Sequence, residues 1–205
     1  GNVSFYNQTK EIGIKPTPVI GGVGLIKDYT KMVTMNFKSE GNLVLVIGKT
    51  EGHLDQSLFA RTILDEKNGP PPEINLFNEK NNGETILKLI EDNYIKSAHD
   101  VSLGGILMGV SKMCIDGNIG IEIKKPNSLL NEFEYFFSED QGRYIIEISK
   151  SDIKKVTSIL EKNAVHYEEI GTLVGKSVSF NEKTIVPVDE LKSYNNNWLK
   201  NYMRW

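Results

Sequence analysis

The sequence has few of the residues that form disulfides or bind metal ions in small domains. Its 205 residues include one cysteine, Cys114, and three histidines, at positions 53, 99 and 166. One cysteine excludes an intrachain disulfide framework and fits an intracellular setting. Zinc sites need clustered cysteines and histidines, so we expect no zinc centre here.

Strong charge of one sign and long apolar runs are also missing. The formal net charge is -3, which provides no basic footprint for nucleic acid. No apolar run approaches the ~20 residues of a membrane span, and no signal peptide is visible. With 39% hydrophobic and 25% charged residues, the composition is that of an ordinary globular protein. We expect a cytoplasmic protein that binds neither nucleic acid nor a membrane.

The common catalytic signatures are missing as well. The sequence contains no P-loop, no GxSxG and no HExxH. Of the three histidines, His99 is the most interesting, because it precedes Asp100 at the end of an expected strand; a structural hydrogen bond is its simplest interpretation. Generic motifs therefore assign no reaction.

The most distinctive stretch that is present is SAHDVSLGG, residues 97–105. It predicts a strand end, a sharp turn and a helix that Asp100 or Ser102 would cap. Gly104 and Gly105 cost helix stability, so they indicate the close approach of another backbone or of a ligand, and spacing favours close packing. The apolar face expected for this helix consists of Leu103, Ile106, Leu107, Val110, Met113 and Cys114.

Periodicity predicts a mixture of strands and helices without a strict alternation. Expected strands are 19–25, 43–47, 119–124, 143–148, 167–174 and 177–188, the last folded about Asn181. Expected helices are 57–65, with Ile63 and Leu64 inward, 85–94, with Leu87 inward, the helix after residue 102, one after a Ser149–Asp152 capping box, and a helical tail at 189–205. This order predicts an α+β fold, a mixed β-sheet packed with helices.

Two further clusters leave their role open. FFSEDQGR, residues 136–143, brings Glu139, Asp140 and Arg143 together, either as a local ion pair or for handling a carboxylate or phosphate. The tail places Leu191, Tyr194, Trp198, Tyr202 and Trp205 at helical spacing, so this stripe should pack across the domain or against a neighbour.

Taken together and in order, five motifs resemble one family. They are GNVSFYNQT, PTPVIGGVGLI, LVLVIGKTEGHLDQSLFA, SAHDVSLGGILMGVSKM and FFSEDQGRYIIEI. The set is similar to phosphoribosylformylglycinamidine synthase, in the AIR synthase-related superfamily. HDVSxGG is shared with AIR synthase, selenophosphate synthetase, thiamine-phosphate kinase and a hydrogenase maturation factor, whereas GNVSFYN is narrower and argues against those alternatives.

The resemblance implies a domain division and a reaction. Residues 1–20 would end a preceding N-terminal-type domain, and residues 21–205 would form the C-terminal-type domain with a helical tail. The family is an ATP-dependent, amidine-forming ligase of purine biosynthesis. It converts formylglycinamide ribonucleotide, ATP and glutamine-derived ammonia to formylglycinamidine ribonucleotide. Its partners would be the preceding domains of the same polypeptide and a glutaminase subunit or domain.

The resemblance also implies site residues. The Gly1 backbone would touch ATP, the Asn2 amide oxygen would bind Mg²⁺, and the Ser4 hydroxyl would bind the ribonucleotide. The family's catalytic histidine lies in earlier domains, so no catalytic residue is expected in this chain, which alone would be inactive. One departure is Asp55-Gln56-Ser57, where the family often has glycine before serine.

Two questions stay open at this point. Asp100, Glu139 and Arg143 match the superfamily pattern, but in this second copy of the domain they would form either a functional or a degenerate, structural site. A structural or interaction domain is the alternative to a contribution to catalysis.

Overall fold

A computed structural model describes residues 8–13, 19–181 and 184–203 of the chain, which divides into two units, residues 1–30 and 31–205. In the first unit, β1 (Gln8–Thr9) and β2 (Ile12–Gly13) form an antiparallel hairpin. The 3-10 turn η1 (Tyr29–Lys31) includes the last residues of this unit and the first residue of the second. The predicted site residues Gly1, Asn2 and Ser4 lie outside the described residues.

The strand expected at residues 19–25 is wrong. This segment forms no strand, and Val19, Ile20, Val23 and Leu25 are each at least nine-tenths exposed. A strand is stabilised by a hydrogen-bonded neighbour, and no neighbour pairs with this segment within the described part of the chain. Three glycines in VIGGVGL further raise the entropic cost of fixing it.

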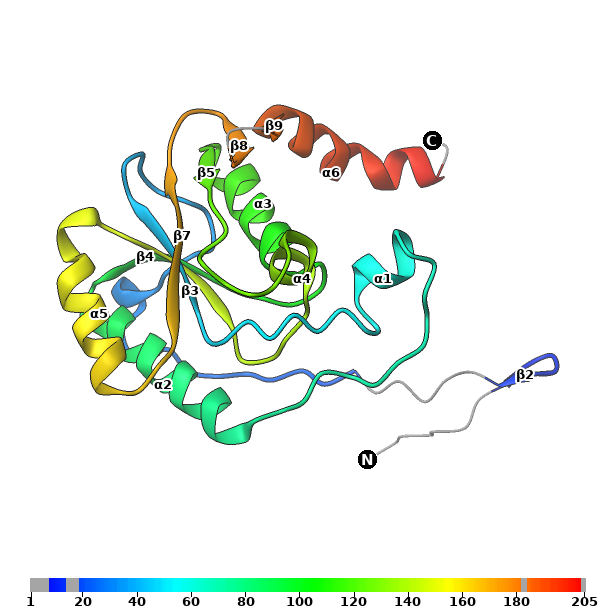
Figure 1. Cartoon of the computed structure of the whole chain (residues 1–205), viewed down its shortest axis with the longest axis horizontal. Coiled ribbons are helices and arrows are strands. Elements are labelled where there is room, and N and C mark those ends of the chain that lie inside the picture. The colour runs from blue at the N-terminus through cyan, green and yellow to red at the C-terminus, as the bar shows by residue number, and fades with distance from the viewer. Residues whose placement is uncertain (1–7, 14–18, 182–183, 204–205) are drawn as a thin grey trace. The chain divides into compact units, whose positions relative to one another are not determined.

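The second unit is built on one seven-stranded sheet (Figure 1). Its spatial order is β4-β6-β3-β7-β5-β8-β9. The strands are β3 (Leu43–Ile47), β4 (Ile95–Asp100), β5 (Ile121–Ile123), β6 (Tyr144–Ile148), β7 (Tyr167–Leu173), β8 (Ser177–Phe180) and β9 (Thr184–Pro187). β5 and β8 are parallel, and the other neighbours are antiparallel. The expected mixed sheet is confirmed.

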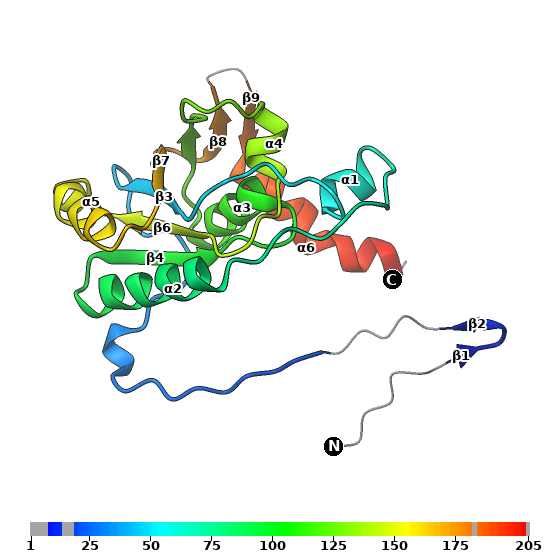
Figure 2. The same ribbon diagram turned by 60° about the horizontal axis from the view of Figure 1, so that its bottom comes forward.

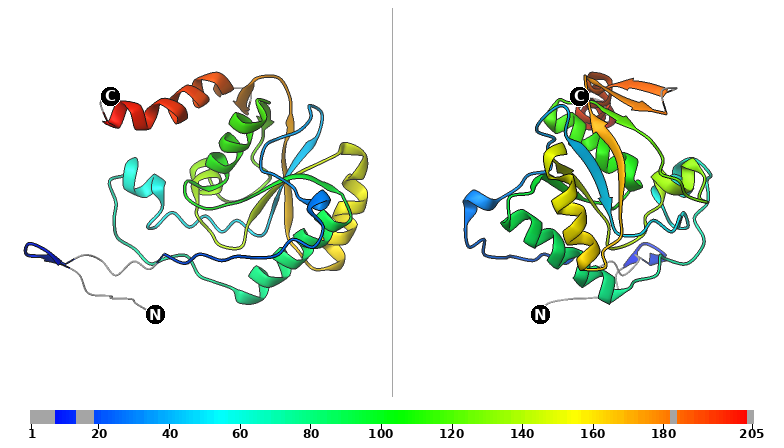
Figure 3. Two further views of the ribbon diagram at one scale, coloured as in Figure 1. Left: turned by 180° about the vertical axis from the view of Figure 1, so that it is seen from behind. Right: turned by 60° about the vertical axis from the view of Figure 1, so that its left-hand side comes forward.

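Helices cover both faces of this sheet (Figures 2 and 3). They are α1 (Leu58–Thr62), α2 (Leu76–Glu91), α3 (Gly105–Gly117), α4 (Glu132–Phe137), α5 (Ile153–Lys162) and α6 (Val188–Met203), with a 3-10 turn η2 (Lys150–Asp152). Val44 and Val46 of β3 face the core with α3, α4 and α6, while Leu43, Leu45 and Ile47 face α2 and α5. The all-apolar run LVLVI is thus buried on both faces, as expected.

The sequence expectations are wrong mainly in where helices begin and in which residues at the edge of a helix face are buried. α2 begins at Leu76, nine residues before the expected start, because Asn75 caps it through a bond from the Asn78 N–H at 3.0 Å. The expected capping box at Ser149 is a 3-10 turn without a side-chain cap. Four residues expected inward, Ile63, Leu64, Leu87 and Leu103, are about half or more exposed.

The free thiol of Cys114 should be inert in the folded chain. Cys114 is fully buried on α3, and burial raises its pKa from 9.0 to about 12. At pH 8 the thiolate fraction is then on the order of one in ten thousand. We expect a thiol reagent at pH 8 to label the native chain only as fast as it unfolds, and the guanidinium-unfolded chain at once. Rapid labelling of native protein, measured by mass spectrometry, would contradict this burial.

Within the described residues, no helix is long and apolar enough to span a membrane.

Candidate functional site

The glycine-bearing turn after β4 starts α3 without a side-chain cap. Gly104 is the N-cap residue at φ +83°, so the expected capping by Asp100 or Ser102 is wrong. The Asp100 carboxylate is largely exposed and lies 3.0 Å from Nδ1 of His99, while the Ser102 carbonyl accepts from the Gly105 N–H. A left-handed residue at this position explains why glycine is needed where a polar cap was expected.

The second glycine of the pair serves close backbone packing. A Cβ atom on Gly105 would lie 2.6 Å from the carbonyl oxygens of both Phe136 and Ser138. Gly105 also has φ +70°, a conformation that disfavours other residues. Of the two interpretations of the glycine pair, backbone packing against residues 136–138, at the end of α4, is therefore the one supported here, rather than a ligand.

The two carboxylates of SEDQGR hold backbone amides of distant segments. One oxygen of Glu139 accepts from the N–H of Leu58 at 2.7 Å and of Gly104 at 2.8 Å, so it joins the starts of α1 and α3. Asp140 accepts from three successive N–H groups, those of residues 51, 52 and 53, at 3.0 to 3.1 Å. Both carboxylates stabilise the loop that precedes α1.

Arg143 completes this cluster as a buried cation. Its side chain is 1% exposed, and its guanidinium donates to the carbonyls of Ser138 and Asp140 and to Oγ1 of Thr50, at 2.7 to 3.2 Å. Its Nη1 lies 3.7 Å from Oδ2 of Asp140. Burial lowers the pKa of Arg143, and the nearby Asp140 charge opposes that shift. These partners are all internal, which supports the structural interpretation over phosphate or carboxylate binding.

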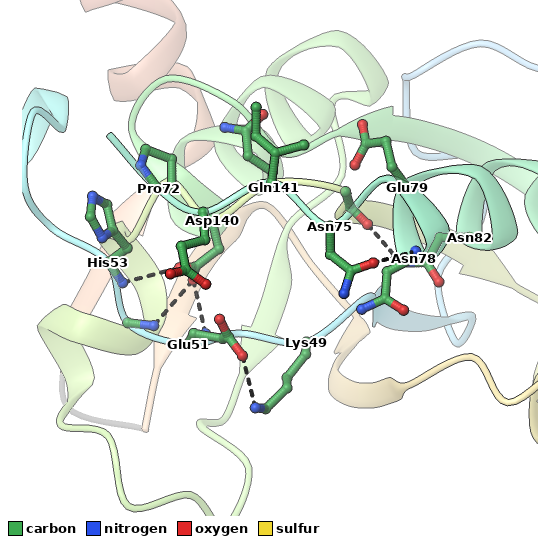
Figure 4. A pocket seen from close by; sticks show the side chains of 14 residues that line it. Lys49, Glu51, His53, Pro72, Asn75, Asn78, Glu79, Asn82, Asp140 and Gln141 are labelled. Atoms are coloured by element: carbon green, nitrogen blue, oxygen red, sulfur yellow. Dashed lines mark hydrogen bonds and ion pairs between the residues drawn. The ribbon is translucent and has the colours of Figure 1, made fainter. Parts of the chain in front are cut away.

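Beside the cluster lies a polar pocket of about 530 Å³ (Figure 4). Three segments form it: the loop 49–53, the residues leading into α2, and 140–142. Figure 4 shows the side chains of Asn75, Asn78 and Glu79 at the start of α2 on one side and His53 and Asp140 on the other. The full lining is Lys49, Glu51, Gly52, His53, Pro72, Glu73, Ile74, Asn75, Asn78, Glu79, Asn82, Asp140, Gln141 and Gly142.

Several polar side chains of this pocket already have partners within the protein. Lys49 donates to Glu51 at 2.8 Å, a contact that raises the pKa of Lys49. A ring nitrogen of His53 lies 3.1 Å from the Pro70 carbonyl, and the Asn82 amide donates to the Gly142 carbonyl at 2.9 Å. The Asn82 bond joins α2 to residue 142, and the His53 contact joins the loop 49–53 to the segment before α2.

The net negative charge of the pocket lining does not suit an anion. Glu51, Glu73 and Glu79 outnumber the single cation Lys49, and Asp140 is balanced by Arg143. The described part of the chain holds no group of three histidine, cysteine, aspartate or glutamate residues able to bind a metal ion. Sequence reasoning missed this pocket, since its asparagines come from helix-start positions that carry an ordinary capping signal.

The fold and these contacts define a mixed-sheet domain in which the glycine turn packs against residues 136–138 and donates a hydrogen bond to Glu139. The sequence matches the family described as AIR synthase related protein, C-terminal domain, over residues 39–181, and the chain belongs to this family.

Two of the curated relatives that the chain matches are both named phosphoribosylformylglycinamidine synthase subunit PurL. The protein from Pelagibacter ubique (strain HTCC1062) is 68% identical over 203 residues, and that from Rhodopseudomonas palustris (strain HaA2) is 38% identical over 203 residues. Both alignments cover 99% of this chain but only 28% of the relative. The chain therefore spans less than a third of these relatives.

A solved structure shows the same fold. It is described as T. maritima PurL complexed with FGAR, with a TM-score of 0.67 and 20% identity, covering 80% of this chain and 30% of that one. At this identity the likeness establishes the fold alone.

Proposed function

We propose that this chain forms part of a phosphoribosylformylglycinamidine synthase, an ATP-dependent ligase of purine biosynthesis. The observation that carries the proposal is the 68% identity, over 203 residues, to a protein of that name. The reaction joins ammonia derived from glutamine to formylglycinamide ribonucleotide, with ATP consumed, to give the amidine.

Within that enzyme, the described domain would support the site rather than perform the chemistry. Its Glu139, Asp140 and Arg143 side chains are engaged by internal partners. These contacts fix the loop before α1 and the starts of α1 and α3, so we assign none of these three side chains as a general acid, base or nucleophile. Catalytic residues would come from the rest of the polypeptide.

The contribution to ligand binding would come from the GNVS segment. The Gly1 backbone would contact ATP, Asn2 would offer an amide oxygen to Mg²⁺, and Ser4 would bind the ribonucleotide. Oxygen ligands suit Mg²⁺, which would offset phosphate charge when bound. Since the described residues hold no metal-binding cluster, carboxylates from elsewhere would complete this site.

The remaining features of the proposal follow the family resemblance. The domain boundary would fall between residues 20 and 21, and the protein would act in the cytoplasm. A glutaminase subunit or domain would supply ammonia, and neither nucleic acid nor a membrane would be a partner. The T. maritima structures described as complexed with ATP and with FGAR agree with these ligands.

A second candidate is a purely structural or interaction domain. The engagement of the polar cluster by internal partners favours it. The two candidates differ in one respect, namely whether the GNVS segment contributes to turnover.

Substitutions in the GNVS segment test this difference. The enzyme would be a full-length chimera in which this chain replaces the matched 203 residues of the Pelagibacter relative. Asn2→Ala should weaken use of Mg-ATP, and Ser4→Ala should chiefly raise the KM for the ribonucleotide. Losing a bond to a charged partner costs about 1.5–3 kcal/mol, which is roughly 10- to 100-fold. Steady-state kinetics with magnesium and ribonucleotide titrated separately would measure both effects.

Asn7→Ala is the matched control, an amide of the same segment with no assigned ligand, and should stay within about twofold of the parent. Parent-like kinetics for both Asn2→Ala and Ser4→Ala would instead favour the interaction domain. The 205-residue chain alone should release no phosphate that depends on the ribonucleotide.

A further inference from the structure

The C-terminal half of α6 carries an aromatic face that nothing in the described part of the second unit covers. At its start the helix is anchored, since Val188 is 1% exposed and Leu191 packs against the core beside α3. Further along, Tyr194, Trp198 and Tyr202 are 71%, 63% and 71% exposed. Figure 3 shows this half of α6 extending away from α3.

The exposed face is ordered and regular. Tyr194, Trp198 and Tyr202 recur every four residues, so they share one side of the helix. The rings of Trp198 and Tyr202 stack at 5.4 Å with an angle of 10° between their planes. Ser193, Asn197 and Asn201 line the same shallow groove. We call these six residues the α6 face.

The chemistry of the α6 face indicates the kind of surface that fits it. It has three aromatic side chains, two carboxamides and three hydroxyls, and none of the six residues is an aspartate, glutamate, lysine, arginine or histidine. Tyrosine and tryptophan are enriched in the buried cores of protein interfaces, because each combines a large apolar area with a polar group at its tip. The matching surface is therefore apolar with a few hydrogen-bonding groups, and not an anionic one such as nucleic acid.

Size decides between a second copy and the same polypeptide. Residues 194–203 span about 15 Å of helix, and a helix is about 10 Å wide. That area is far below the ~800 Å² per partner of a stable two-protein complex. Within one polypeptide the partner surface is present at a high effective concentration, so a small patch suffices. The relatives contain such additional chain, because this chain covers only 28% of their length.

We propose that the α6 face is an intramolecular interface, which packs against an apolar groove in the part of the family's polypeptide outside the 203 matched residues. The proposal rests on family membership and not on the proposed reaction. The kinetic test of the reaction and the footprinting test of the interface can therefore contradict their proposals independently.

Hydroxyl-radical footprinting tests it, because tryptophan, tyrosine and methionine are among the side chains that react readily and all three occur on this half-helix. Modification rates of Trp198, Tyr202 and the nearby Met203 would be compared between the 205-residue chain and the full-length chimera. We expect at least a fivefold lower rate in the chimera. Equal rates in the two proteins would overturn the proposal.

A variant pair sharpens the test. In the chimera, Trp198→Ala should raise the rate at Met203 at least threefold, while Lys200→Ala, an exposed residue outside the α6 face, should not. Continued protection of Met203 in Trp198→Ala would overturn the proposal. So would protection already present in the 205-residue chain at 100 µM and lost at 1 µM, which would identify a second copy as the occupant.

Discussion

Arg143→Met should lower the free energy of unfolding of the chain by about 3–5 kcal/mol, the range found when one partner of a buried ion pair is removed. Arg143 is 1% exposed and holds three internal acceptors at 2.7 to 3.2 Å. Methionine keeps much of the volume but supplies no donor, so two carbonyls and a hydroxyl lose their partner. The Asp140 carboxylate also loses its nearest cation.

Urea unfolding followed by circular dichroism would measure this loss. Arg61→Met is the matched control, since Arg61 is an exposed arginine on α1 that donates to the Ser57 carbonyl at 3.3 Å, a bond that water can replace. It should cost less than about 1 kcal/mol. A similarly small loss for Arg143→Met would show that the guanidinium is free for a ligand, and would restore the phosphate-handling interpretation of SEDQGR.

The sequence predicted the sheet well because strand patterns are local. LVLVI at 43–47 is a continuous apolar run, and at 121–123 buried isoleucines alternate with a partly exposed glutamate; both became strands where expected. The hairpin about Asn181 was also confirmed, with Asn181 at φ +48°. Hydrophobic periodicity and turn-forming residues can be recognised in a short stretch of sequence, without information about distant residues.

The polar contacts were not predictable in the same way, since their partners are far apart in the sequence. Glu147 lies inside the apolar run YIIEI and is fully buried. Its carboxylate accepts from the N–H groups of Lys38 and Ser39, from Asn42 and from the Ser97 hydroxyl, at 2.7 to 3.1 Å. These partners are 50 to 109 residues away, so only the fold brings them together.

The same limit applies to the site. The grouping of Glu139, Asp140 and Arg143 was visible as a motif, but its role depended on which amides reach the carboxylates. Those amides belong to the loop before α1 and to the starts of α1 and α3. The departure Asp55-Gln56-Ser57 proved compatible with this loop, because Ser57 caps α1 and Gln56 adopts φ +61° without being glycine.

The glycine turn provides the second large effect. Gly105→Ala should cost about 2–5 kcal/mol of unfolding free energy, from two additive sources. A left-handed conformation costs a non-glycine residue about 1–2 kcal/mol. Overpacking adds about 1–3 kcal/mol, because the new Cβ would meet two carbonyl oxygens at 2.6 Å and backbone cannot rotate away as a side chain does.

Gly175→Ala separates these two sources. Gly175 has φ +62°, close to the +70° of Gly105, but a Cβ atom added to it would meet no described atom within 4 Å. It should therefore cost only the conformational contribution of about 1–2 kcal/mol. Urea unfolding of both variants gives the difference directly. An excess of about 1 kcal/mol or more for Gly105→Ala, the lower end of the overpacking cost, would confirm that the glycine exists for backbone packing against residues 136–138. Equal losses would mean that this segment yields to the methyl group, and that the glycine pair must be explained by something other than close packing.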